Sequence, residues 1–235
     1  MIQLLVAFAL AGAPCPAGAT SEANLCRAMA AQEAGQFADS ATSFETAAGL
    51  AKPGDPAASR MLAAAGNMWI AANQPGKAAL AIDRALAGGG LLADQRGLAL
   101  LDRARAAEAQ GDLKTARAKL ALAAQSSAED PFLWYFSAAL AIRENDIPAA
   151  KVAINRALTM APNDPATLFE AGHVSQAAGE DAKARDYWTR AAAADPNGAS
   201  GNAARRALGL LVVPLTVTNQ VATRPNGDGE GPGHR

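Results

Sequence analysis

His173 and Glu170 are the side chains whose types and spacing come nearest to those of a catalytic site. They stand three residues apart, so a helix would place them on one face, where the carboxylate could orient the imidazole as a general base. A nucleophilic mechanism also needs a Ser, Cys or second His in a partnering position, and none occurs there. We therefore expect no catalytic residue and interpret His173 as a partly exposed residue of a binding groove. An enzyme built on this pair is the weaker alternative.

The remaining composition argues against cofactors and against polyanionic partners. The chain has only two His and two Cys, too few for a structural zinc site or a haem. The triplet Gly88-Gly89-Gly90 is not followed by Lys and Ser or Thr, so it predicts a linker and not a phosphate-binding loop. With 21 basic and 22 acidic residues the net charge is −1, which gives no basic field for nucleic acid or an anionic membrane. We expect no metal, no cofactor and no nucleic-acid partner.

The first residues have the pattern of a targeting signal. Residues 2–11 form an apolar run that is too short for a membrane span of about 20 residues and suits a signal peptide. The small-residue motif Ala17-Gly18-Ala19 predicts cleavage after Ala19, giving a signal peptide over 1–19 and no membrane span after cleavage. The earlier motif Ala11-Gly12-Ala13 is a poorer site because Pro14 follows it. We expect a periplasmic or secreted protein, with a cytoplasmic one as the alternative.

This cleavage site decides what the two cysteines can do. It would remove Cys15 and leave Cys26 as the only thiol. A single cysteine makes no intramolecular disulfide, so Cys26 is predicted to be a small buried apolar residue. The fold would then depend on helix packing alone.

The composition predicts an all-α fold to position any site. The chain contains 63 Ala, whereas Val and Ile together supply only 13 residues. Alanine is the best helix former, and strands favour β-branched and aromatic residues instead.

A period of 34 residues organises these helices. Alanine occupies position 27 of five consecutive units, and a large apolar residue occupies position 24. The units are 21–54, 59–92, 97–130, 131–164 and 165–198. Their position 27 residues are Ala47, Ala85, Ala123, Ala157 and Ala191, and their position 24 residues are Phe44, Ile82, Leu120, Ile154 and Trp188. Alanine at a fixed position lets two helices approach closely, so each unit is expected to be a helix hairpin.

Gly, Asn and Asp-Pro mark the ends of these predicted helices. Position 15 of the units reads Gly35, Asn73, Gly111, Asn145 and Gly179. Gly and Asn tolerate the left-handed backbone that closes a helix, so they predict the end of the first helix in each hairpin. The pairs Asp130-Pro131, Asp164-Pro165 and Asp195-Pro196 predict an N-cap followed by proline in the first turn.

This pattern resembles the tetratricopeptide repeat. The resemblance covers residues 21–198 and includes Trp134 at position 4, with Gly66 and Gly172 at position 8. It implies a right-handed α-solenoid of about five helix–turn–helix repeats whose concave face is lined by positions 2, 5, 6, 9, 12 and 13 of each first helix. Beyond the repeats we expect a capping helix over 199–213 and a disordered tail over 214–235.

The function implied by the resemblance is the binding of proteins or peptides in the concave groove. Aromatic residues are scarce in the chain but cluster in the fourth and fifth units, where they belong either to the groove or to the core. The predicted groove residues are Leu101, Arg105, Phe132, Tyr135, Phe136, Arg143, Phe169, Glu170 and His173. We expect a non-enzymatic scaffold or adaptor that binds a segment with apolar anchors. The alternative is a self-associating structural module of the cell envelope.

Overall fold

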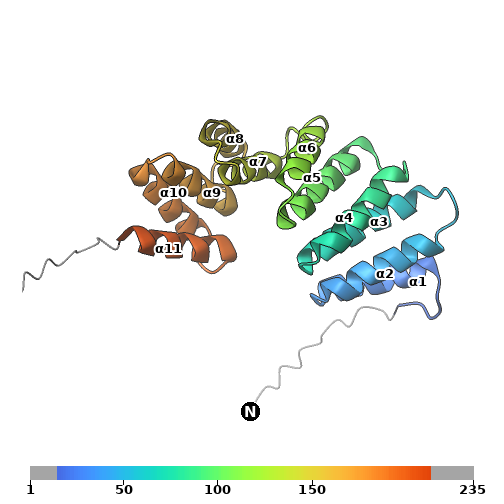
Figure 1. Ribbon diagram of the computed structural model, residues 1–235. Helices are drawn as coiled ribbons and strands as arrows, with labels where there is room; N and C mark the ends of the chain where they lie inside the picture. The colour runs from blue at the N-terminus through green and yellow to red at the C-terminus, as the bar shows by residue number, and fades with distance from the viewer. Residues whose placement is uncertain (1–14, 213–235) are drawn as a thin grey trace, which may run out of the picture.

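The computed structural model describes residues 15–212, and the described part of the chain is built from eleven α-helices arranged in an arc (Figure 1). The helices are α1 (Ser21–Glu33), α2 (Phe37–Leu50), α3 (Pro56–Ala71), α4 (Pro75–Ala87), α5 (Ala93–Ala109), α6 (Leu113–Ala123), α7 (Pro131–Arg143), α8 (Ile147–Met160), α9 (Pro165–Ala177), α10 (Asp181–Ala194) and α11 (Ala199–Val212). Each odd-numbered helix from α1 to α9 packs against the even-numbered helix that follows it. The all-α solenoid of helix hairpins expected from the sequence is confirmed.

The turns inside the five hairpins adopt the predicted left-handed backbone. At position 15 of every unit φ is positive, from 55° at Asn73 to 79° at Gly111. Among the described residues, Asn73 and Asn145 are the only ones other than glycine with a positive φ. This conformation is costly for most side chains and is tolerated by Gly and Asn, so these positions fix where the first helix ends.

The two helices of each hairpin meet along a seam of small residues. The five alanines at position 27 are all 0% exposed. Position 20 is also fully buried in every unit, and its one serine, Ser40, donates its hydroxyl to the Ala28 carbonyl at 2.8 Å. With side chains this small, the two helix backbones approach closely and bury the seam completely.

Large apolar residues fill the space beside each seam. Ile82 is fully buried and Trp188 is 1% exposed. Each packs directly over a glycine of the preceding helix, since a Cβ added to Gly66 or Gly172 would overlap these side chains. The Trp188 indole also donates to the Phe169 carbonyl at 3.0 Å, which ties α10 to α9.

Two of the three predicted Asp-Pro helix starts are confirmed, and the third is wrong. Asp130 accepts from the Phe132 amide at 2.9 Å, and Asp164 accepts from the Thr167 amide at 2.7 Å, each with proline in the first turn. Asp195 instead ends α10, and its carboxylate accepts from the Gly201 amide at 3.2 Å across the turn that leads into α11. Asp195 therefore still accepts a hydrogen bond from an amide near the start of α11, but it lies at the end of α10 and not at the N-cap of α11.

The C-terminal helix α11 covers the end of the arc. It packs against α10 and also reaches α9. Ala204 is fully buried there beside Trp188 in one apolar cluster. The predicted tail over 214–235 lies outside the described residues. Within residues 15–212 no helix combines the length and apolar character needed to cross a membrane.

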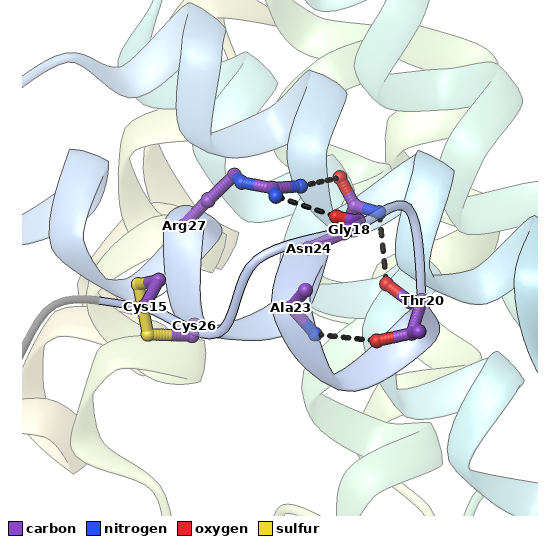
Figure 2. The surroundings of a disulfide bond; sticks show 7 residues. All are labelled: Cys15, Gly18, Thr20, Ala23, Asn24, Cys26 and Arg27. Carbon is purple, nitrogen blue, oxygen red and sulfur yellow. Dashed lines mark hydrogen bonds between the residues drawn. A yellow bond between two sulfur atoms is a disulfide. The ribbon is translucent and has the colours of Figure 1, made fainter.

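The prediction that Cys26 is a free thiol is wrong. Cys26, in the second turn of α1, is bonded to Cys15 with a Cα–Cα distance of 5.6 Å (Figure 2). The expectation assumed that Cys15 would be absent from the folded chain. Instead residues 15–20 run back along α1 and bring the two sulfur atoms together, a contact that the helical period does not encode.

Candidate functional site

Helices α3, α5 and α7 begin successive hairpins of the arc, and α5 and α7 lie nearer its concave side than α6 and α8 (Figure 1). On α3, Arg60 and Asn67 lie two helical turns apart, and on α5, Leu98 and Arg105 have the same spacing. Residues seven apart share a helix face, and α3 packs beside α5. The two faces therefore form adjoining walls.

Two cavities open side by side between these walls. The first, of about 240 Å³, lies between α3 and the start of α5, and the second, of about 340 Å³, extends from α3 and α5 to the start of α7. Leu98 and Asp102 line both, so the cavities adjoin. The first is lined by Arg60, Ala63, Leu91, Gln95, Leu98, Ala99 and Asp102, and the second by Asn67, Leu98, Leu101, Asp102, Arg105, Asp130 and Phe132. We call the two adjoining cavities together the α3–α5–α7 groove.

Large apolar side chains in the α3–α5–α7 groove are open to solvent. Leu98 is 52% exposed and Phe132 is 37% exposed. The buried ring of Phe136 stacks parallel to Phe132 with centroids 6.3 Å apart and holds it in place. Exposed apolar side chains in a concave site gain free energy when a ligand covers them.

A hydrogen-bonded network forms the polar part of the same groove. The Asp102 carboxylate accepts from Asn67 Nδ2 at 2.9 Å and from Arg105 Nη1 at 2.9 Å. The Arg105 guanidinium lies 5.5 Å from the centroid of the Phe132 ring. A charge held by both an ion pair and an aromatic ring is pre-positioned, so a ligand need not order it on binding.

A second cluster lies further along the concave side, on α7 and α9. Glu170 is only 7% exposed, and its Oε2 lies 3.4 Å from Nδ1 of His173, whose ring contacts Phe169 at a centroid distance of 4.3 Å. Burial raises the pKa of the half-buried Tyr135, and the Glu170 carboxylate raises it further. The cluster joins a carboxylate to aromatic rings, a combination suited to hydrogen-bond donors and cations.

The structure divides the predicted groove residues between surface and core. Phe132, Arg105 and the buried Leu101 line the α3–α5–α7 groove, while Phe136 belongs to the core beneath it. Arg143 forms an ion pair with Glu108 of α5. Tyr135, Phe169, Glu170 and His173 gather in the second cluster.

Leu91 and Gln95 are among the lining residues that sequence reasoning missed. They precede the third 34-residue unit, which was counted from Gly97. The helix itself begins at Ala93, where Gln95 Oε1 accepts from the Leu92 amide at 3.1 Å. The sequence signal for this earlier helix start is Gln95, because a glutamine three residues after the N-cap is a common pattern at helix N-termini.

Within the described part of the chain, no three His, Cys, Asp or Glu residues come together as candidate ligands. Glu170 and His173 come nearest to an acid–base pair on the concave side. The His173 ring contacts the Glu170 carboxylate and the Phe169 ring on α9, and the Trp188 ring on α10.

Comparison with solved structures identifies the fold. The type IV pilus biogenesis factor PilW superposes with a TM-score of 0.63 at 18% identity, covering 77% of this chain and 81% of PilW. MamA gives 0.59 at 12% identity, with 75% of this chain and 92% of MamA covered. YrrB, described as a tetratricopeptide-repeat protein with an unusual peptide-binding site, gives 0.55 at 14% identity and covers 79% and 92%. No protein-family model and no curated protein sequence matches the chain. The chain has the tetratricopeptide-repeat fold.

Proposed function

We propose that this protein is a non-enzymatic scaffold that binds a peptide segment of another protein in the α3–α5–α7 groove. The observation that carries the proposal is that two adjoining cavities share Leu98, and that Leu98 and Phe132 are exposed there although both are large and apolar. Isolated exposed apolar residues are common on protein surfaces, but apolar residues that line one concave space are typical of binding sites.

The groove chemistry suggests what the bound segment looks like. Apolar anchors of the segment would fill the spaces beside Leu98 and Phe132, because these side chains offer the exposed apolar surface. Polar groups of the segment would meet the fixed Arg105 and Asp102 at the edge of these anchors. An extended peptide or an amphipathic helix with two apolar anchors fits this arrangement.

The second cluster would extend the contact to α9. Its aromatic rings and the Glu170 carboxylate lie on the same concave side as the α3–α5–α7 groove. The similarity to YrrB, a protein described by its peptide-binding site, and to PilW, a pilus biogenesis factor, supports a role as an adaptor or assembly factor in the bacterial periplasm. The predicted signal peptide points the same way.

Selection of peptides on the purified protein tests the proposal. Peptides would be enriched from a random displayed library on the wild-type protein and remeasured by fluorescence polarisation on Leu98→Ser and Phe132→Ala. Both residues are partly exposed, so the circular dichroism should stay unchanged, while affinity should fall by about tenfold or more. Leu80→Ser is the matched control, because Leu80 is 68% exposed on α4 and lines neither cavity.

Two results would contradict the proposal. The first is a selected peptide that binds the groove variants as tightly as wild type. The second is a mass that rises with protein concentration in light scattering while selection enriches no peptide, which would favour the self-associating envelope module.

A further inference from the structure

The segment before α1 belongs to the folded structure. Residues 15–20 run antiparallel to the first turns of α1 and are fastened to it at two points (Figure 2). One is the Cys15–Cys26 disulfide. The other is Arg27, whose Nη2 donates to the Gly18 carbonyl at 2.6 Å. These contacts hold Cys15 and Gly18 against α1.

The same segment supplies the cap of the helix. Thr20 Oγ1 accepts from the Ala23 amide at 3.1 Å, and the Thr20 carbonyl accepts from Asn24 Nδ2 at 2.9 Å. Asn24 is buried, and its Oδ1 accepts from Arg27 Nη1 at 3.1 Å. Thr20, Asn24 and Arg27 thus form one network from the cap to the Gly18 carbonyl, and the disulfide lies beside it.

Cleavage after Ala19 is incompatible with this arrangement. It would remove Cys15, which bonds to Cys26, and Gly18, which accepts from Arg27. A mature chain with this arrangement therefore keeps residues 15–20.

We propose that the mature chain keeps Cys15 and that its disulfide to Cys26 forms in an oxidising compartment and braces the N-terminal end of the solenoid. The inference is independent of the groove. Both cysteines are half-buried, so a disulfide-carrying oxidoreductase can reach them. In the exchange the Sγ–Sγ bond forms, the disulfide of the oxidoreductase breaks, and the two protons and two electrons pass to its two thiols.

A brace is useful at this place because α1 is the first helix of the stack. Within the described residues, α1 has a full helix partner only in α2, whereas an internal hairpin has neighbours on both sides. The end units of a solenoid lack one neighbouring interface and open first. A disulfide that closes a loop from Cys15 to Cys26 restricts the opened state and so opposes this fraying.

The test begins with the full-length chain, carrying its own N-terminus and a C-terminal tag, expressed in a bacterial host and recovered from the periplasm. N-terminal sequencing is expected to read a first residue no later than Cys15. Alkylation with iodoacetamide in denaturant is expected to modify no cysteine before reduction and two after it. A first residue beyond Cys15, such as Thr20, or a thiol that reacts before reduction would overturn the proposal.

Loss of the disulfide tests the brace in the same preparation. Cys15→Ser is expected to accelerate amide hydrogen exchange in residues 21–33 by roughly tenfold or more. Residues 165–177 serve as an internal reference in the same sample. Equal exchange in residues 21–33 of Cys15→Ser and wild type would refute the brace.

Discussion

The hairpin seams and the α3–α5–α7 groove follow opposite rules. Every seam has a fully buried alanine at position 27 and a large buried residue at position 24, so the same packing recurs in all five hairpins. The groove side chains instead change from hairpin to hairpin: positions 6 and 9 hold Asp102 and Arg105 on α5 but Glu170 and His173 on α9.

The seam residues serve stability, whereas the groove residues serve the binding of a partner. A seam needs only small size and apolar character, which close packing enforces at every repeat. A groove that distinguishes one ligand needs side chains that differ from repeat to repeat. We therefore expect seam substitutions to reduce stability and groove substitutions to reduce binding.

The largest effect is expected from Trp188→Ala. Trp188 is 1% exposed and lies directly over Gly172, so its removal leaves a large cavity beside the seam of α9 and α10. We expect the free energy of unfolding to fall by about 3–5 kcal/mol, measured by urea denaturation followed by circular dichroism. The exposed Leu80→Ala on α4 is the control and should change it by less than about 0.5 kcal/mol. A loss below about 1 kcal/mol for Trp188→Ala would mean that the seam does not determine stability.

A smaller loss is expected from Ala157→Leu. Ala157 is 0% exposed in the seam between α7 and α8, so a larger side chain must push the helices apart. The expected cost is about 1–3 kcal/mol in the same denaturation experiment. Val152→Leu, on the same helix at 70% exposure, provides the matched control and should leave the midpoint unchanged. An unchanged midpoint for Ala157→Leu would argue against close packing at position 27.

The smallest effect on stability is expected in the groove, from Asn67→Ala. The substitution removes the hydrogen bond from α3 to Asp102, but Arg105 still pairs with the carboxylate. We expect a loss of about 1 kcal/mol, because one hydrogen bond is removed and its acceptor keeps another partner. Asn155→Ala, at an exposed position of α8, should have no measurable effect. A loss as large as that of Trp188→Ala would show that the groove network also maintains the fold.

The ion pairs between neighbouring hairpins could not be predicted from neighbouring residues in the sequence. Arg143 and Glu144 are neighbouring opposite charges in the sequence, but Arg143 pairs with Glu108 and Glu144 pairs with Arg117. Both pairs connect α7, or the residue after it, to the preceding hairpin. Such partners lie about one repeat away in the chain, and the angle between successive hairpins decides which side chains meet.

The sequence by itself determined the features that repeat. The fixed spacing of alanines predicted the buried seams, and Gly or Asn at position 15 predicted the left-handed turns, because steric limits act within a few residues. These local rules were enough to predict the helix hairpins and their order.

Only the tertiary structure decided which residues line the groove and how the chain begins. Phe132 and Phe136 are both aromatic and one turn apart, yet one is exposed in the groove and the other is core, since the tilt of α7 against α5 sets what each ring meets. The pairing of Cys15 with Cys26 likewise depends on the path of residues 15–20 beside α1. Contacts between elements depend on how the elements are placed in space, and a periodic pattern carries no information on that placement.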